Sequence, residues 1–225
     1  MNNILVLGSK QNSLLPDIKV KKIYSANAAC EKADLYLKKY PDTSHTSIVG
    51  LKHFMHDQGV QKRVLNSKID KFVTRGKGDI NQFNFKSKIV QISLVKQFKM
   101  QSKMFKYGYL DLFLAELRYE EELFKKFYYL MKCLKQKSFL GVSTGFFAII
   151  YALIENPDSE IIISGISMRQ GSHFYPEATR NFTGRANVDN YLIKNISKKF
   201  RTRLQSLDIE LYQTHKIKKW NGRKF

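Results

Sequence analysis

Short apolar runs that end in small or polar residues recur along the chain. Runs of this length, rich in β-branched residues and bounded by turn-forming residues, are typical of buried strands. They predict strands at 4–7 (ILVL), 22–25 (KIYS), 46–51 (TSIVGL), 72–74 (FVT), 89–92 (IVQI) and 160–164 (EIIIS). In open α/β sheets ligands bind beyond the carboxyl ends of the strands, so the residues that follow these runs are candidate contacts.

The stretch 138–167 predicts a compact strand-helix-strand unit. An apolar run at 139–142 predicts its first strand, and the apolar segment 146–154 predicts a buried helix that ends at Asn156-Pro157-Asp158. The next strand, at 160–164, would be parallel to the first. Between the first strand and the helix lie Ser143, Thr144 and Gly145, whose unpaired N–H groups would donate hydrogen bonds to a phosphate. Simple helix capping by the two hydroxyls is the alternative.

Other segments complete an α/β pattern. Helices are predicted at 31–39, at 110–136 as one long helix or a helical pair, and from an N-cap at Asp189 through Leu204, whereas 209–212 predicts a closing strand. We therefore expect a Rossmann-like, mostly parallel sheet flanked by helices. A single domain would span residues 1–225, with a helical insertion or lid at 107–137 and a basic tail at 214–225.

The charge of the chain is strongly positive. It has 39 Lys and Arg against 19 Asp and Glu, a net charge of +20. Such a field attracts polyanions, which include nucleic acid, anionic membranes and acidic glycolipids. The longest uncharged run, 139–154, is too short to span a bilayer. Membrane contact, if there is any, is therefore expected to be peripheral.

Four short motifs occur in a recognisable order. They are LVLGSKQNS at the N-terminus, Ser25-Ala26-Asn27, the turn VSTG at 142–145 and the strand end SGI at 164–166. The set resembles the sialyltransferases of glycosyltransferase families 42 and 29, in which the corresponding elements surround a CMP-sugar. The resemblance covers the sheet core and leaves residues 52–137 unmatched. It implies inverting transfer of a ulosonic acid, either sialic acid or Kdo, from a CMP-sugar.

The resemblance also implies roles for individual residues. Asn27 would contact the donor phosphate or ribose, Ser143 and Thr144 would hold the cytidine monophosphate, and the SGI strand end would lie along the nucleotide. The alternative to a binding role is that Asn27 is simply a turn residue at a strand end. The implied nucleotide-binding residues are Gly8, Ser9, Asn27, Ser143, Thr144, Gly145, Gly165, Ile166 and Ser167.

Two departures from the family pattern affect the first loop and the catalytic base. The usual Gly-x-Gly-Pro-Ser loop reads GSKQN at 8–12, and the His before the last helix is replaced in TGRAN at 183–187. The best replacement is His173 in RQGSHFY at 169–175, which resembles the His-x-Tyr element of family 29; an ordinary loop histidine is the alternative. Imidazole suits a base that takes the proton of the acceptor hydroxyl. Candidate donors to the departing phosphate are Arg169, Tyr175, Arg180 and Arg185.

Metal ions and cofactors are not expected to take part. His53 and His56 lie three residues apart near Asp57, but they lack a further ligand, so a solvated helix face is favoured. The sequence contains no Asp-x-Asp pair that would chelate a metal-bound nucleotide. The expected enzyme is metal-independent and uses no cofactor, the CMP-sugar being its substrate.

The basic surface indicates an anionic acceptor. A glycolipid such as bacterial lipopolysaccharide core, or an oligosaccharide, fits best. Basic residues at 216–224 surround Trp220 and precede Phe225, a composition that fits an anchor on an anionic membrane surface and a solvated tail equally well. The expected location is the cytoplasm, peripherally bound to the inner membrane. The rival is a basic nucleic-acid-binding protein without catalytic activity, which the lack of a recognisable RNA or DNA module disfavours.

Overall fold

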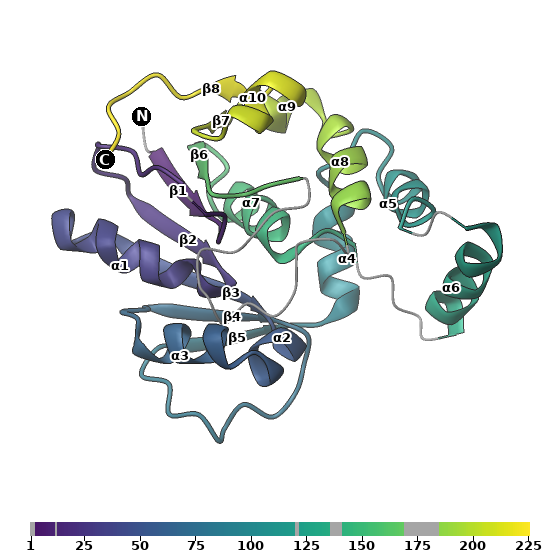
Figure 1. Cartoon of the computed structure of the whole chain (residues 1–225), viewed down its shortest axis with the longest axis horizontal. Helices are drawn as coiled ribbons and strands as arrows, with labels where there is room; N and C mark the ends of the chain where they lie inside the picture. Colours follow the sequence, from purple (N-terminus) through teal and green to yellow (C-terminus); the bar gives the residue numbers. More distant parts are fainter. Residues whose placement is uncertain (1–2, 12, 120–121, 136–140, 169–184) are drawn as a thin grey trace.

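The computed structural model describes residues 3–11, 13–119, 122–135, 141–168 and 185–225. Its strands form one eight-stranded sheet, in the order β5-β4-β3-β2-β1-β6-β7-β8, and every pair is parallel (Figure 1). Helices flank this sheet, so the Rossmann-like α/β prediction is confirmed. The strands are β1 (Asn3–Leu7), β2 (Lys22–Ala26), β3 (Ser44–Gly50), β4 (Lys71–Arg75), β5 (Lys88–Ile92), β6 (Glu160–Ser164), β7 (Leu204–Ser206) and β8 (Lys218–Lys219).

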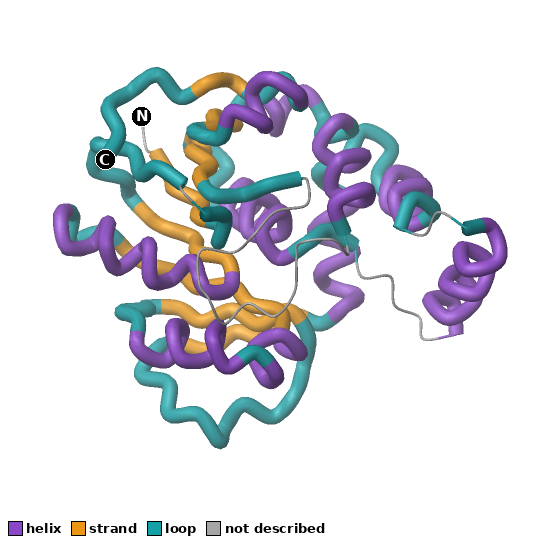
Figure 2. Tube along the Cα trace, in the orientation of Figure 1, coloured by secondary structure: helices purple, strands orange, loops and turns teal. Residues whose placement is uncertain are grey.

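Helices cover both faces of the sheet (Figure 2). In β1, Ile4 and Val6 pack in the same core cluster as the buried residues of α7, while Leu5 and Leu7 pack with α1 on the opposite face. This alternation follows from the two-residue period of a strand. The helices are α1 (Cys30–Lys39), α2 (Leu51–His56), α3 (Gln58–Asn66), α4 (Leu94–Ser102), α5 (Tyr109–Glu116), α6 (Leu123–Lys135), α7 (Thr144–Glu155), α8 (Ala186–Lys194), α9 (Lys198–Arg201) and α10 (Ile209–Thr214).

The central unit differs from its prediction at the first strand. Residues 139 and 140 lie outside the described residues, and neither Gly141 nor Val142 belongs to a strand. Their backbone N–H groups donate to the side chains of Glu116 and Gln101, at 2.8 and 3.0 Å, instead of to a neighbouring strand. The predicted strand is therefore wrong in its described half, whereas the buried helix and the strand that follows it are confirmed as α7 and β6.

The end of the chain also differs from its prediction. Residues 209–212, predicted as a strand, begin α10, and the sheet closes with β7 and β8. Asp208 occupies the N-cap position of α10 without a capping hydrogen bond from its side chain, and Glu210 lies in the first turn; negative charge at both positions favours a helix start. The local preference for a helix start outweighed the strand-like alternation of Ile209 and Leu211.

The helix predicted from Asp189 to Leu204 is broken. α8 begins before Asp189 and ends at Lys194, a single turn follows as α9, and Leu204 lies in β7. Asp189 does not cap the helix. Its buried carboxylate accepts a hydrogen bond of 2.9 Å from the backbone N–H of Ser143, which ties α8 to the start of α7.

The insertion before α7 is the helical pair, not one long helix. α5 packs against α8, and α6 extends beyond it, away from the sheet (Figure 1). Among the described residues, no helix combines the length and the apolar character that a membrane crossing needs.

Residues 214–225 fold back onto the body of the protein. The N–H of Trp220 donates to the carbonyl of Ser206 at 2.8 Å, and Phe225 exchanges two backbone hydrogen bonds with Leu15, both 2.9 Å long. The Phe225 ring stacks on Tyr36, with 6.1 Å between ring centroids. The segment is therefore anchored by its aromatic residues, while its Lys and Arg side chains are exposed.

Candidate functional site

The strand order reverses direction next to β1. β1 pairs with β2 on one side and with β6 on the other, and Leu7 lies opposite both Ser25 and Ser164. The residues that follow these positions therefore emerge side by side at the carboxyl edge. A parallel α/β sheet binds its ligands at such a switch point, because the connections leave the edge in opposite directions there.

Two glycines close the switch point tightly. The N–H of Gly8 donates to the carbonyl of Ser164 at 2.8 Å, and the N–H of Lys10 donates to the carbonyl of Gly165 at 2.9 Å. A Cβ atom on Gly8 would lie 2.1 Å from the Gly165 oxygen. Gly165 has φ of +72°, in the left-handed region that favours glycine. Backbone thus approaches backbone here with no room for a side chain on Gly8.

The start of α7 faces the same strand ends. The Ser143 hydroxyl accepts a hydrogen bond of 3.3 Å from the N–H of Phe146, so Ser143 is the N-cap of α7. A Cβ atom on Gly145 would lie 3.5 Å from the side chain of Ile166, just beyond β6. The structure therefore brings together Gly8, Gly145, Gly165 and Ile166 from three separate motifs.

Asn27 brings a buried side-chain oxygen without a hydrogen-bond partner in the described residues to this edge. It follows β2, two positions beyond the residue that pairs with Leu7, and it has φ of +52°. Its side chain is only 7% exposed, and its Oδ1 atom has no hydrogen-bond partner in the described part of the chain. A buried acceptor without a partner costs about 1–3 kcal/mol, which a ligand that donates a hydrogen bond would relieve.

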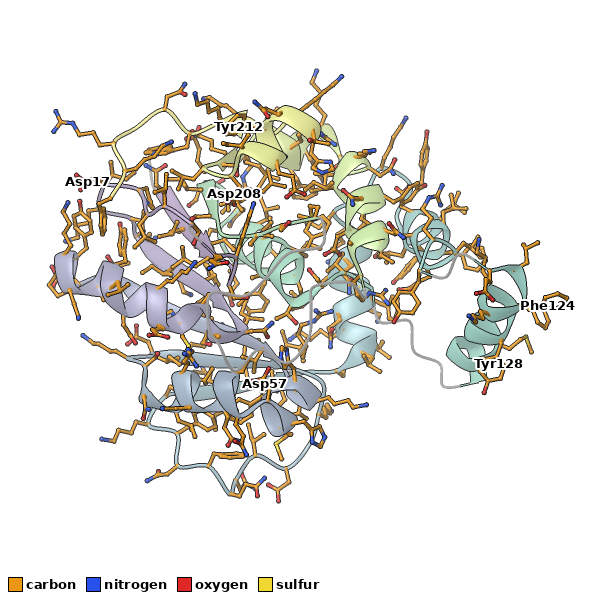
Figure 3. The ribbon with its side chains drawn as sticks, in the orientation of Figure 1. Asp17, Asp57, Phe124, Tyr128, Asp208 and Tyr212 are labelled. Carbon is orange, nitrogen blue, oxygen red and sulfur yellow. The ribbon has the colours of Figure 1, made fainter. Side chains whose placement is uncertain are left out.

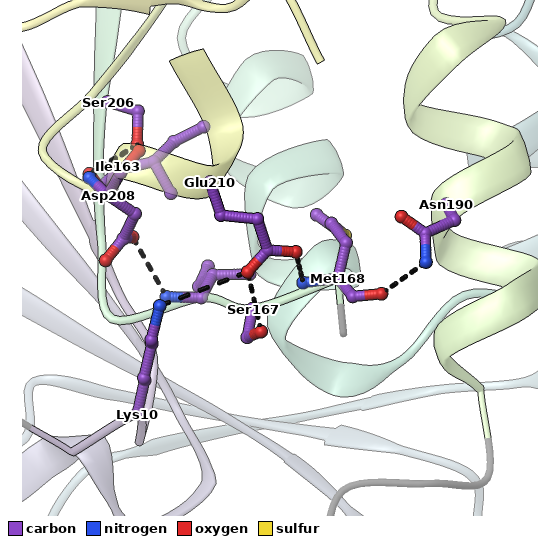
Figure 4. A network of polar contacts seen from close by, with 9 residues as sticks. Lys10, Ile163, Ser167, Met168, Asn190, Ser206, Asp208 and Glu210 are labelled. Carbon is purple, nitrogen blue, oxygen red and sulfur yellow. Dashed lines mark hydrogen bonds and ion pairs between the residues drawn. The ribbon is translucent and has the colours of Figure 1, made fainter. Parts of the chain in front are cut away.

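Acidic residues beyond β7 bind the strand end of β6 (Figure 4). The N–H of Ile166 donates to Asp208 Oδ2 at 3.2 Å, and the Ser167 hydroxyl donates to Glu210 Oε2 at 2.8 Å. The Lys10 ammonium lies 4.0 Å from the same Glu210 oxygen. Burial raises the pKa of Asp208 to about 6. The predicted nucleotide residues Ile166 and Ser167 are thus held in place by side chains that the sequence analysis did not identify.

A second cation approaches the first loop from α1. The Lys32 ammonium donates to the carbonyl of Lys10 and to the hydroxyl of Ser13. Burial lowers the pKa of Lys32 to about 8, against the opposing attraction of Asp208. Two ammonium groups therefore lie near the Gly8-Ser9 loop, where Ser9 itself is buried.

Arg75 links the end of β4 to the start of α7. It donates to the Val142 carbonyl at 2.8 Å and to the Thr144 hydroxyl at 3.4 Å, and its guanidinium lies 4.6 Å from the Phe147 ring centroid. Burial, and then the charge of Arg185, lowers the pKa of Arg75. Arg75 therefore orients Thr144. Arg75 directly follows the strand predicted at 72–74, and this position could have indicated it as a site residue.

Arg185 is the predicted catalytic residue that lies within the described residues. Its guanidinium forms an ion pair with the buried carboxylate of Glu116, at the end of α5, and lies 5.0 Å from the Tyr119 ring centroid. Burial raises the pKa of nearby Asp189 to about 6, although the charge of Arg185 opposes this rise. The other catalytic candidates, which lie outside the described residues, are Arg169, His173, Tyr175 and Arg180.

Of the two histidines considered as metal ligands, His53 has another partner and His56 is exposed. His53 forms a hydrogen bond of 2.8 Å with Asp57, four residues further along the chain. Within the ranges that the structure describes, no group of three or more His, Cys, Asp or Glu residues is placed to hold a metal ion.

Two cavities lie at the opposite edge of the sheet. One of about 350 Å³ is lined by residues 64–69 and 84–87, which precede β4 and β5. Another of about 310 Å³ lies beside it, between α1 and the end of α3. None of the predicted site residues lines either cavity, and the chemistry described above belongs to the carboxyl edge.

Comparisons with protein-family models, with curated proteins and with solved structures found no match to this chain. The fold defines a parallel α/β protein whose candidate site lies at the carboxyl edge of the sheet.

Proposed function

We propose that this protein is an inverting, metal-independent glycosyltransferase that moves a ulosonic acid, sialic acid or Kdo, from a CMP-sugar to an anionic glycolipid. One observation carries the proposal. Three of the motifs that resemble glycosyltransferase families 42 and 29 contact one another around the switch point, and the fourth supplies Asn27 at the same edge. The enzyme would act at the cytoplasmic face of the inner membrane, where it meets a lipid-linked acceptor.

The donor would bind between the first loop and α7. At the start of α7 the N–H of Ser143 already donates to Asp189, so the N–H groups of Thr144 and Gly145 would bind the phosphate, and Thr144 would add its hydroxyl. The unpaired Oδ1 of Asn27 would accept a hydrogen bond from a ribose hydroxyl or the cytosine amine, both of which are donors. The ammonium groups of Lys10 and Lys32 would favour a negatively charged sugar nucleotide.

The transfer itself needs a base and a stabilised leaving group. The acceptor hydroxyl would attack the anomeric carbon as the bond to CMP breaks, and His173 would take the hydroxyl proton. Arg169 and Tyr175 would donate hydrogen bonds to the departing phosphate. Arg185 would join them by sharing its guanidinium between the phosphate and Glu116.

Calorimetry tests the donor site directly. CMP should bind more tightly than UMP, AMP or GMP. Thr144→Val should weaken CMP binding about tenfold or more, since a lost hydrogen bond to the charged phosphate costs about 1.5–3 kcal/mol, and Asn27→Ala should weaken it by up to about tenfold, since a lost hydrogen bond between neutral groups costs about 0.5–1.5 kcal/mol. Asn81→Ala, in an exposed loop, is the matched control. Unchanged CMP affinity in folded Asn27→Ala and Thr144→Val would refute the site.

Kinetics test the assignment of the base. His173→Ala should slow turnover by roughly 100- to 10,000-fold, and a chelator should leave the rate unchanged. A near-normal rate for His173→Ala would remove the residue from the mechanism, and full inhibition by a chelator would remove metal independence.

The net charge of +20 and exposed aromatic residues such as Tyr107 and Tyr109 favour a second candidate, a nucleic-acid-binding protein. That function would give oligonucleotide binding that weakens steeply with salt, without selective binding of CMP.

A further inference from the structure

α6 exposes its apolar side chains to solvent. Phe124 and Phe127 are 92% and 68% exposed, and Tyr128 and Met131 are 73% and 49% exposed. Their spacing of three and four residues places them on one face of the helix. Phe124 and Tyr128 point away from the sheet (Figure 3). An amphipathic helix in a globular protein normally buries this face, so the exposed stripe requires a partner.

α5 extends the apolar surface. Its inner side is buried through Leu112 and Ala115, whereas Tyr109, Leu110 and Phe113 are each more than 40% exposed on its outer side. Nine of the seventeen large apolar side chains that are exposed in the described part of the chain lie between residues 107 and 131. The exposed apolar residues are therefore concentrated on this helical pair, which we call the α5–α6 surface.

Positive charge borders the stripe. The sequence of α6, LFKKFYYLMKCLK, contains four lysines and no acidic residue. The glutamates at 120–122 precede the helix, and Glu122 forms an ion pair with Lys125 at 2.7 Å. Lys103 and Lys106, just before α5, are also exposed. Aromatic and aliphatic residues on one face, with lysines beside them, are typical of helices that lie in the interface of an anionic bilayer.

We propose that the α5–α6 surface is a docking site for an anionic lipid bilayer. A second copy of this chain is disfavoured as the occupant, because each copy carries a net charge of +20 and the two would repel each other. Nucleic acid is disfavoured because the α5–α6 surface includes Leu110, Leu123 and Met131, which lack the aromatic ring on which bases stack. An anionic bilayer satisfies both the apolar side chains and the lysines.

The docking surface is joined to the carboxyl edge of the sheet. Glu116, the last residue of α5, accepts a hydrogen bond from the N–H of Gly141 and pairs with Arg185. A bilayer that covers α5 and α6 would therefore lie next to the edge that holds Asn27 and the start of α7. The proposal does not depend on glycosyl transfer, since any function of that edge would then be exercised at a membrane.

Vesicle sedimentation tests the proposal on the full-length protein. We expect it to sediment with phosphatidylcholine vesicles that contain phosphatidylglycerol, and far less with phosphatidylcholine alone. Phe124→Glu combined with Phe127→Glu should weaken binding roughly tenfold or more, because two aromatic side chains no longer enter the interface. Leu35→Glu combined with Leu65→Glu is the matched control: these residues are exposed on α1 and α3 and give the same change of charge.

Each outcome decides between the occupants. Loss of binding in the α6 variant alone supports the proposal. Equal loss in both variants means that net charge alone drives binding, and it overturns the proposal. It is also overturned if the wild type does not bind anionic vesicles, if size-exclusion chromatography shows a dimer that only the α6 variant disrupts, or if an oligonucleotide binds through this stripe instead. Calorimetry with CMP on the same variants keeps the two proposals distinguishable, because the α6 variant should bind CMP normally.

Discussion

Replacing Gly8 by alanine should separate the two central strand ends. The added Cβ atom would lie 2.1 Å from the carbonyl oxygen of Gly165 and 2.6 Å from a side-chain carbon of Ile166. The oxygen belongs to the backbone and cannot turn away as a side chain could. Relief therefore requires the ends of β1 and β6 to move apart by roughly 1 Å, since non-bonded atoms repel steeply inside their contact distance.

That movement breaks specific contacts. The hydrogen bonds from Gly8 to Ser164 and from Lys10 to Gly165, 2.8 and 2.9 Å long, span this junction. Overpacking in a core costs about 1–3 kcal/mol, and each buried backbone group left unpaired costs about 1–3 kcal/mol more. We expect Gly8→Ala to lower the free energy of unfolding by about 3 kcal/mol or more, a large part of the 5–15 kcal/mol typical of a domain.

Urea denaturation, followed by circular dichroism, measures this loss. Gly145→Ala is the matched control, because its Cβ atom would make an ordinary contact of 3.5 Å with Ile166, and alanine favours a helix over glycine by up to about 1 kcal/mol. Gly145→Ala should therefore be as stable as the wild type or more stable. Equal stability of Gly8→Ala and the wild type would show that the switch point is not closed as described.

Three further expectations follow from charge and packing. Burial raises the pKa of Asp208 to about 6, so this carboxyl group holds its proton more tightly in the folded protein than in the unfolded chain. The resulting contribution to the free energy of unfolding is fully present below about pH 4 and is lost as the pH rises through about 6. Urea titrations of Asp208→Asn should match the wild type at about pH 4 and show a gain of up to ~3 kcal/mol at neutral pH, since one pKa unit corresponds to about 1.4 kcal/mol. A difference independent of pH would contradict this. Burial opposes ionisation of Glu155, but hydrogen bonds from Lys71, Tyr151 and Tyr24 lower its pKa to about 2. Glu155→Gln should therefore lower the free energy of unfolding by about 1 kcal/mol at neutral pH. This loss of stability should disappear as the pH falls from about 4.5 to 2. Deletion of residues 216–225 removes β8 and the contact between Phe225 and Tyr36, and should lower the midpoint of thermal unfolding clearly, whereas an unchanged midpoint would mean that this segment does not pack as described.

The strands of the sheet centre could be predicted because they are buried on both faces. β1 and β6 present continuous apolar runs, and β2 carries the buried pair Ile23-Tyr24. The small and polar residues that follow these strands were recognisable as turn formers. For this reason Gly8, Asn27 and Gly165 were identified in the sequence, and the structure places all three at the carboxyl edge of the sheet.

The outer strands carry no such signal. β7 is the three-residue segment LQS, with buried polar side chains, and β8 consists of two exposed lysines. These strands form because the sheet edge and β6 offer backbone partners, a tertiary effect that local pattern does not report. Because β7 was not recognised, residues 209–212 with Glu210 were predicted as the closing strand, and the contacts of Asp208 and Glu210 with Ile166 and Ser167 were missed.

The most direct test of the proposed function is a crystal structure of the protein with CMP. We expect the nucleotide at the carboxyl edge of β1 and β6, with its phosphate at the start of α7 and a donor group within hydrogen-bond distance of Asn27 Oδ1. CMP bound instead in the cavities beside β4 and β5, or no bound CMP at saturating concentration, would contradict the proposed function.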